Sequence, residues 1–167
     1  MRLAVALSSS VLAILAAGCG SDVSQLKAEV TNAAPVASRS AGCTGLDGFI
    51  ESAWVKCILV VHGTRREVIA DVATRLRRRG FRLGCEDSLG TLELVAVRGQ
   101  TRVIADARPG AITFDPSDGG KPLDVVDSKF APPGSRRIRA GSVGLELDAD
   151  KLETPAASYP LPRGSCP

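Results

Sequence analysis

The sequence is poor in the residues that mark a metal centre or a catalytic site. It contains a single histidine, His62, and no two of its five cysteines form a C-x-x-C pair. Structural zinc sites are usually built from cysteine and histidine at such short spacings. The G-x-S-x-G motif of hydrolase nucleophiles is also missing from the sequence. We therefore expect no metal and no cofactor, and the sequence favours a non-catalytic protein over an enzyme.

Charge and aromatic side chains are sparse as well. The formal net charge is only +3, and 4% of the residues are aromatic. A charge this small argues against a general binder of polyanions. No aromatic residues alternate with the arginines, as they would in a groove that stacks on bases or sugars. We therefore expect no nucleic-acid partner.

The only long uncharged stretch lies at the N-terminus. Residues 3–17 follow one basic residue, Arg2, and are interrupted only by three serines. As a helix this stretch would be about 22 Å long, whereas the hydrocarbon core of a bilayer is about 30 Å thick. The segment is therefore short for a membrane span, and its layout is typical of a secretory signal.

The end of this stretch carries a more specific motif. Residues 15–19, Leu-Ala-Ala-Gly-Cys, resemble the lipobox of bacterial lipoproteins. The resemblance implies cleavage just before Cys19, a diacylglycerol on its thiol, and acylation of the freed amine by a chain such as palmitate. Two or three chains anchor a protein persistently, because each buried methylene contributes about 0.8 kcal/mol.

The residue after the lipobox cysteine bears on localisation. It is Gly20 rather than aspartate. The sorting rule of bacterial lipoproteins then implies the outer membrane in a host with two membranes. In a host with one membrane it implies the outer leaflet of the plasma membrane.

The resemblance divides the chain into three segments. Residues 1–18 form the signal peptide, residues 19–42 a flexible tether and residues 43–167 a single small domain. The tether is rich in alanine and serine and contains no aromatic residue. As a flexible coil it would span about 26 Å. The rest of the chain has the length of one ordinary domain.

The best-defined element is a helix that starts at Thr64. Thr64 and Glu67 match the S/T-x-x-E capping box. Apolar residues follow at helical spacing from Val68 to Leu76, and Gly80 stands where a left-handed C-terminal cap belongs.

Strands are expected on both sides of this helix. They are marked by continuous or alternating apolar residues and cover 58–61, 81–86, 92–97, 101–107 and 142–148. Gly99 and Gln100 fit a hairpin turn, and residues 115–135 read as a Pro/Gly-rich loop with at most a brief strand near Val125. The order strand, helix, strand, strand, strand predicts an α+β fold. In it, one main helix packs on a mostly antiparallel sheet of about four to five strands, stapled by disulfides.

Four cysteines remain besides Cys19. An even number of thiols outside the cytoplasm predicts disulfides among Cys43, Cys57, Cys85 and Cys166. If the strands before and after the helix are the parallel arms of a right-handed crossover, Cys57 and Cys85 lie roughly 15 Å apart, beyond the roughly 7 Å limit for bridged α-carbons. This favours Cys43 with Cys57 and Cys85 with Cys166. Cys43 with Cys85 and Cys57 with Cys166 remain the alternative.

His62 is the candidate catalytic base, because it ends a buried strand just before a glycine and a helix. A hydrolase would need a nucleophile beside it and an acid to orient it. No nucleophile motif accompanies it. We expect a strand-end histidine that bonds to backbone or water.

The predicted loop contains four aspartates, Asp115, Asp118, Asp124 and Asp127. Calcium takes several carboxylate oxygens from a flexible loop, and in an EF-hand these oxygens come from fixed positions of a twelve-residue loop. The pattern fails, because the bidentate twelfth position would be Val126. We therefore expect a solvated loop.

Arginines form the densest charged cluster of the domain. Seven lie between residues 64 and 82, against two acidic residues. Four of them, at the end of the predicted helix, form a candidate anion site: Arg75, Arg77, Arg78 and Arg79. Such a site could hold an anionic envelope component or an acidic protein. The alternative is a solvated face that complements the helix dipole.

Two functional hypotheses follow. The first is a cell-envelope lipoprotein with a non-catalytic binding or interaction domain, attached to the membrane through Cys19. The second is an extracytoplasmic hydrolase that uses His62.

Overall fold

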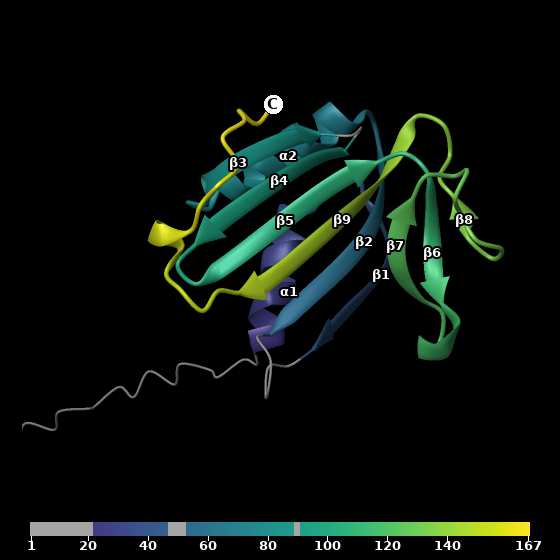
Figure 1. The fold of residues 1–167 in the computed structure, drawn as a ribbon, viewed down its shortest axis with the longest axis horizontal. Helices are drawn as coiled ribbons and strands as arrows, with labels where there is room; N and C mark the ends of the chain where they lie inside the picture. The colour runs from purple at the N-terminus through teal and green to yellow at the C-terminus, as the bar shows by residue number, and fades with distance from the viewer. Residues whose placement is uncertain (1–21, 47–52, 89–90) are drawn as a thin grey trace, which may run out of the picture.

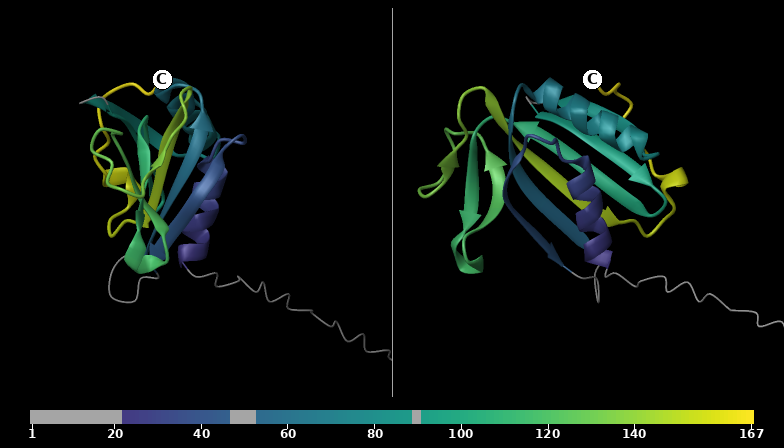
Figure 2. Two further views of the ribbon diagram at one scale, coloured as in Figure 1. Left: turned by 90° about the vertical axis from the view of Figure 1, so that its right-hand side faces the viewer. Right: turned by 180° about the vertical axis from the view of Figure 1, so that it is seen from behind.

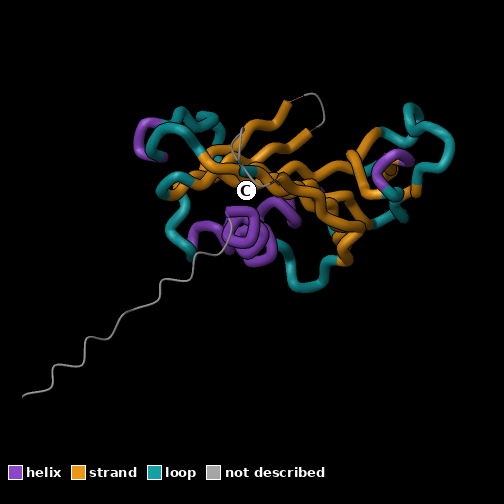
Figure 3. The backbone as a smooth tube through the Cα atoms, turned by 90° about the horizontal axis from the view of Figure 1, so that it is seen from below, coloured by secondary structure: helices purple, strands orange, loops and turns teal. Residues whose placement is uncertain are grey.

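The main feature of the fold is a six-stranded antiparallel sheet with both helices on one face. The computed structural model describes residues 22–46, 53–88 and 91–167, and the strand order in this sheet is β1-β2-β9-β5-β4-β3 (Figure 1). Its elements are β1 (Arg39–Leu46), β2 (Trp54–His62), β3 (Arg82–Ser88), β4 (Thr91–Arg98), β5 (Thr101–Arg108), β9 (Ser142–Lys151), α1 (Asp22–Ala33) and α2 (Arg65–Arg78). Seen along the sheet, the two helices lie on the same side of it (Figure 3).

The main core fills the space between this sheet and the helices. Alternate residues of the strands point towards the helices, and on β9 these are Val143, Leu145, Leu147 and Ala149, all buried. The side chains between them point to the opposite face. We call that opposite side the outer face of the main sheet.

Helix α2 confirms the sequence prediction at both ends. The Thr64 side chain accepts a hydrogen bond from the Glu67 amide, and the Glu67 carboxylate accepts one from the Thr64 amide, 2.7 Å away. At the other end Gly80 has φ 81°, and the Phe81 amide donates to the Leu76 carbonyl. These contacts form a Schellman motif, in which glycine adopts the left-handed conformation without a Cβ clash.

Helix α1 differs from the expected flexible tether of residues 19–42. Leu26, Val30 and Ala33 follow at helical spacing and are buried against the main sheet. The polar and small residues around them hide this stripe from a reading based on composition. The described structure therefore begins with a packed helix at Asp22, and the predicted signal segment and Cys19 lie outside the described residues.

A three-stranded sheet covers part of the outer face. Its order is β7-β6-β8, with β6 (Ala111–Asp115), β7 (Lys121–Val126) and β8 (Arg136–Arg137), and a 3-10 turn, η1 (Pro116–Asp118), joins β6 to β7. Ile58 of the main sheet, Ile112 and Val125 form a small apolar cluster between the two sheets. Residues 115–135 thus include a paired strand, whereas the sequence predicted a loop with at most a brief strand.

The C-terminal segment covers the other end of the outer face. After η2 (Ala156–Ser158) the chain crosses β3, where a Cβ on Gly84 would lie 2.3 Å from the Pro162 carbonyl oxygen. The Cys85 amide then donates to the Gly164 carbonyl, which pairs the otherwise free edge of β3. Figure 2 shows this segment and the small sheet on the side of the main sheet away from the helices.

The two disulfides are Cys43–Cys57 and Cys85–Cys166, as the sequence favoured. The expected geometric reason for this pairing, a right-handed crossover between two parallel strands, is not correct. Strands β2 and β3 do point the same way, but β9, β5 and β4 lie between them. Cys57 and Cys85 are therefore separated mainly across the sheet rather than along it.

The α+β class and the antiparallel sheet are confirmed, and the predicted number of elements is too small. The β4–β5 hairpin turns at Gly99 and Gln100 as expected. The described residues hold two helices and nine strands in two sheets, rather than one main helix and four to five strands. None of the helices in the described ranges is long and apolar enough to cross a membrane.

Candidate functional site

A cleft of about 350 Å³ opens between the main sheet and the β6–β7 hairpin. Its apolar wall consists of Trp54, the first residue of β2, together with Pro122 and Leu123 of β7. Trp54 is 37% exposed and Leu123 55% exposed. The volume is within the range of small-molecule sites. We call this hollow the Trp54 cleft.

The polar wall of the Trp54 cleft is formed by three carboxylates and two lysine ammonium groups. Asp115, Asp118 and Asp148 line it beside two lysines. The ammonium group of Lys121 lies 2.9 Å from Asp118. The Asp115 carboxylate accepts hydrogen bonds from the amide and hydroxyl of Ser117. Asp148 forms no hydrogen bond or ion pair with any residue in the described ranges, although the positive charge of Lys56 acts on it from a greater distance.

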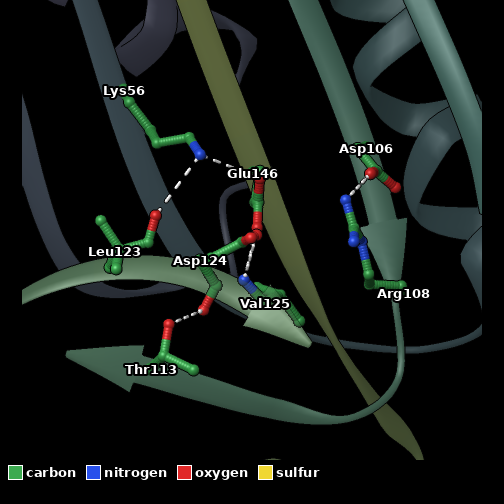
Figure 4. A network of polar contacts seen from close by, with 8 residues as sticks. All are labelled: Lys56, Asp106, Arg108, Thr113, Leu123, Asp124, Val125 and Glu146. Atoms are coloured by element: carbon green, nitrogen blue, oxygen red, sulfur yellow. Dashed lines mark hydrogen bonds and ion pairs between the residues drawn. The ribbon is translucent and has the colours of Figure 1, made fainter. Parts of the chain in front are cut away.

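Behind the cleft, a chain of charged residues connects the two sheets (Figure 4). Lys56 of β2 donates to the Leu123 carbonyl at 3.4 Å and forms an ion pair with Glu146 of β9 at 3.3 Å. The Glu146 carboxylate in turn accepts from the Val125 amide of β7. The small sheet is therefore held to the main sheet by polar contacts as well as by its apolar cluster.

Burial shifts the acid–base properties of this network. Loss of hydration and a hydrogen bond to Asp124 raise the pKa of Glu146, while the Val125 amide and Lys56 lower it, and the net pKa is about 7. The same bond holds the pKa of Asp124 below its usual value, although burial opposes this. In Lys56, burial lowers the pKa, but Glu146 and Asp148 outweigh it and the net pKa is raised. Burial also raises the pKa of Asp148 to about 6.

Asp106 and Arg108 extend the charged strip along β5. They form an ion pair, and Asp106 is 8% exposed. The second carboxylate oxygen of Asp106 and Nε of Arg108 are buried without a hydrogen-bond partner in the described structure. Burial raises the pKa of Asp106 despite the neighbouring guanidinium. This pair lies beside Glu146 in the strand register and does not line the Trp54 cleft.

His62 lies elsewhere, exposed at the end of β2. It borders a shallower hollow with Glu67, Asp71 and Arg75, and the remaining walls come from residues 35–37, Val61 and Val68. No serine, threonine or cysteine is among these lining residues. Ser142 of β9 lies directly opposite His62 in the strand register, but it does not line this hollow, and no hydrogen bond joins the two side chains in the described structure.

The arginines at the end of α2 are not held together as one free anion site. Arg75 donates to Asp71 of its own helix at 3.1 Å, and Arg79 pairs with Glu29 of α1 at 2.9 Å. Arg98 joins the same carboxylate at 2.7 Å. These contacts link α2, α1 and β4.

Only two of the four candidate arginines stay open to an anionic partner. Arg77 and Arg78 are exposed, and neither forms a hydrogen bond or an ion pair with a described residue. The anion site predicted from four arginines is thus reduced to a pair.

The four aspartates predicted as a solvated loop are divided between different places. Asp115 and Asp118 line the Trp54 cleft, Asp124 belongs to the charged network, and Asp127 caps a turn by accepting from the Lys129 amide. Among the described residues, no group of three or more histidine, cysteine, aspartate or glutamate side chains could hold a metal ion.

Sequence reasoning missed the residues that build the Trp54 cleft and its network. The available signal was the alternation in β9, where Glu146 and Asp148 point away from the apolar positions. An alternating strand usually has its polar face in water. That the β6–β7 hairpin covers this polar face depends on residues far away in the chain.

Comparisons with protein-family models, with curated proteins and with solved structures give no match to this chain. Its function must therefore be inferred from the geometry and chemistry of its own residues.

Proposed function

We propose that this protein is a non-catalytic binding module of the cell envelope that is lipid-anchored through Cys19 and takes its ligand in the Trp54 cleft. The cleft carries this proposal. It combines a partly exposed tryptophan and leucine with a half-buried carboxylate, Asp148, that forms no hydrogen bond or ion pair in the described structure. A concave site with apolar walls and a few polar groups is the usual form of a small-molecule site.

The extracytoplasmic location is supported by two independent features. Two disulfides tie the domain together, and such bonds are typical of proteins outside the cytoplasm. The lipobox-like sequence at residues 15–19 gives the export and anchoring signal. Cys19 would carry the lipid in the outer membrane of a two-membrane host or the outer leaflet of a one-membrane host.

The start of α1 determines how close the domain stands to the membrane. Asp22 is the third residue after Cys19. Three peptide units span at most about 11 Å. A lipid on Cys19 would therefore hold the N-terminal end of α1 at the headgroups, rather than about 26 Å away on a flexible coil.

The Trp54 cleft lies at the same end of the molecule as the start of α1. Figures 1 and 2 show the start of β2, which is Trp54, and the η1 turn, which contains Asp118, at this end. The proposed ligand site would thus be close to the membrane surface. A ligand that is released from or bound to the envelope could reach it there.

The hydrolase alternative has less support. Its candidate base, His62, has Ser142 opposite it in the strand register, but the two side chains are not hydrogen-bonded in the described structure and Ser142 does not line the hollow beside His62. Within the Trp54 cleft, Lys56 is already bonded to Glu146 and Leu123. A binding function needs none of these groups to react.

Lipid attachment is tested by metabolic labelling with an alkyne-bearing fatty acid in a bacterial host. The full-length protein should incorporate the label and partition with membranes, whereas Cys19→Ser should do neither. Cys43→Ser is the matched control, because it removes a thiol and should still be labelled. Equal labelling of Cys19→Ser would overturn the anchor.

Use of the cleft is tested by photo-crosslinking in intact cells. A photo-reactive amino acid replaces Leu123 in the cleft or, as the control, Phe130, which is 74% exposed and does not line it. We expect a ligand adduct, seen as a discrete mass increase, at position 123 only. His62→Ala should leave this adduct unchanged. No adduct at 123, or the same adduct at both positions, would contradict the binding function of the cleft.

A further inference from the structure

The charge distribution inside the Trp54 cleft points to the chemical class of its ligand. We propose that the cleft binds a small organic cation, an ammonium group carried on an apolar body, with the ammonium between Asp148 and the ring of Trp54. This inference rests on the proposed function, because it presumes that the cleft is the ligand site.

The cleft has an unbalanced negative charge. Of its carboxylates, only Asp118 has an ammonium partner, Lys121. The ammonium group of Lys56 lies 3.3 Å from the carboxylate of Glu146, which does not line the cleft. The positive charge of Lys56 is therefore shared with a group outside the cleft. Asp115 and Asp148 are therefore left without a cation bonded to them in the described structure. A cationic ligand would supply the missing counter-charge.

Asp148 is the carboxylate best placed to bind that charge. It lies on β9 directly opposite Lys56 in the strand register, and it is half-buried. The second point of attachment of Lys56, the Leu123 carbonyl at 3.4 Å, directs its ammonium group towards the hairpin. A buried carboxylate without a bonded partner is unfavourable unless a positive charge or a hydrogen-bond donor joins it.

Trp54 lies next to this carboxylate on the same face of the sheet. Trp54 pairs with Asp150, so Asp148 is its diagonal neighbour across the β2–β9 pair. Side chains in diagonal positions are roughly 7 Å apart at their backbones and can reach a common ligand. An ammonium group within about 6 Å of an indole ring is attracted to its face. The exposed Leu123 provides the apolar surface for the rest of the ligand.

Other ligand classes fit the same walls less well. An anion would meet three carboxylates, while both lysines already have acidic partners. A neutral ligand such as a sugar could stack on Trp54, but it would leave Asp148 without a cation bonded to it. The ammonium ligand satisfies both groups at once.

Trp54 also makes the site measurable, because it is the only tryptophan in the chain. The mature lipidated protein in detergent is titrated with 2-phenylethylamine and, separately, with its neutral analogue 2-phenylethanol and the anion 3-phenylpropanoate. We expect a saturable change in tryptophan fluorescence with the amine, and affinities for the two analogues at least about tenfold weaker. Protein-free micelles correct for partitioning of the probes.

Two variants assign the effect to Asp148. Asp148→Asn should weaken amine binding by about tenfold, which corresponds to about 1.4 kcal/mol. Asp127→Asn removes one carboxylate from the same hairpin region but away from the cleft, and should bind like the wild type. Circular dichroism confirms that both variants fold. If Asp148→Asn does not, the wild type alone gives the answer, since its affinity for the amine should fall below about pH 6 as Asp148 is protonated.

The outcomes separate the ligand class from the function of the cleft. Equal or tighter binding of the alcohol or the carboxylate, or no saturable response to the amine, would overturn the cation proposal. If Leu123 still gives its specific adduct in cells, the binding function stands and only the ligand class fails. If neither experiment gives a signal, both proposals fail.

Discussion

The two faces of the main sheet are built from the same strands and have opposite chemistry. The face towards the helices is closed and apolar, and both helices pack on it. The outer face carries Lys56, Asp106, Glu146 and Asp148, and it is covered only in part by the small sheet and the C-terminal segment. The first face provides the stability of the domain, whereas the second contains partly buried charged groups with which a ligand can pair.

Strand β9 shows the difference most directly. Leu147 and Asp148 are neighbours in sequence and point to opposite faces. Leu147 is fully buried in the main core, while Asp148 lines the Trp54 cleft. Changes to each face should therefore affect different properties.

The largest expected effect comes from the disulfide that fastens the C-terminal segment over the sheet. Cys85–Cys166 closes a loop of 81 residues, and Cys43–Cys57 one of 14. Loop-closure entropy then gives losses of about 4 to 5 kcal/mol for the first and about 3 kcal/mol for the second. Denaturant unfolding of the two double cysteine-to-alanine variants measures both losses. A larger loss for the 43–57 pair would contradict this ranking.

Next is the closed face of the sheet. Leu147→Ala should lower the free energy of unfolding by about 3 kcal/mol, because it leaves a cavity in a fully buried position. Asp148→Asn is the matched control on the next residue. It should not lower stability, and at neutral pH it should raise it, since burial disfavours the charged form of Asp148. Similar losses in both variants would show that the two faces are not separable.

The outer face should also make stability depend on pH. Glu146 has a pKa of about 7 in the fold, above its ordinary 4.5, so its stabilising contribution is complete below about pH 4.5 and is lost as the pH rises through 7. Asp148, raised to about 6, acts with the same sign. Asp124 is lowered, so its contribution is lost in strong acid. We expect greatest stability at mildly acidic pH, with a fall on the order of 2 kcal/mol by about pH 8.

Glu146→Gln identifies the group responsible. Glutamine can still accept from the Val125 amide and donate to Asp124, as protonated Glu146 does. The variant should lose most of the decline between about pH 5 and pH 8, measured by urea unfolding across this range. An unchanged pH profile would assign the decline to other groups.

The smallest effects are expected among the arginines of α2. Arg77→Gln and Arg78→Gln should each change stability by less than about 0.5 kcal/mol, because both side chains are exposed. Glu29→Gln should lower it by about 1 kcal/mol, since this carboxylate joins Arg79 and Arg98. Thermal unfolding at low and high salt measures these changes in stability and distinguishes the two exposed arginines from the ion-paired Glu29. A loss of more than 1 kcal/mol from Arg77→Gln would show that this residue has a structural partner.

Local patterns predicted the elements whose formation depends on neighbouring residues. The capping box at Thr64, the left-handed Gly80 and the hairpin at Gly99 are all present, because each is determined by contacts within a few residues. The apolar alternation of β9 also identified the buried face correctly. Helix α1 was missed because three buried residues among polar neighbours give too weak a local signal.

The candidate site could not be predicted in the same way. Trp54, Leu123 and Asp148 are far apart in the chain, and they meet only because the β6–β7 hairpin folds back over β2 and β9. Conversely, the arginines that are dense in the sequence are divided by tertiary ion pairs to Asp71 and Glu29. Charge density along the chain is thus a poor measure of free charge on the surface.

By itself, the sequence determined the α+β class, the antiparallel sheet and helix α2, because hydrophobic period, capping and turn residues act over short distances. It also contains the lipobox-like segment before the domain. The tertiary structure alone decided that residues 22–33 join the core, that a second sheet covers part of the outer face, and that a tryptophan and a carboxylate without a hydrogen-bonded partner share one cleft. These features arise from contacts between distant residues, and the burial and charge pairing that define a site exist only after those contacts have formed.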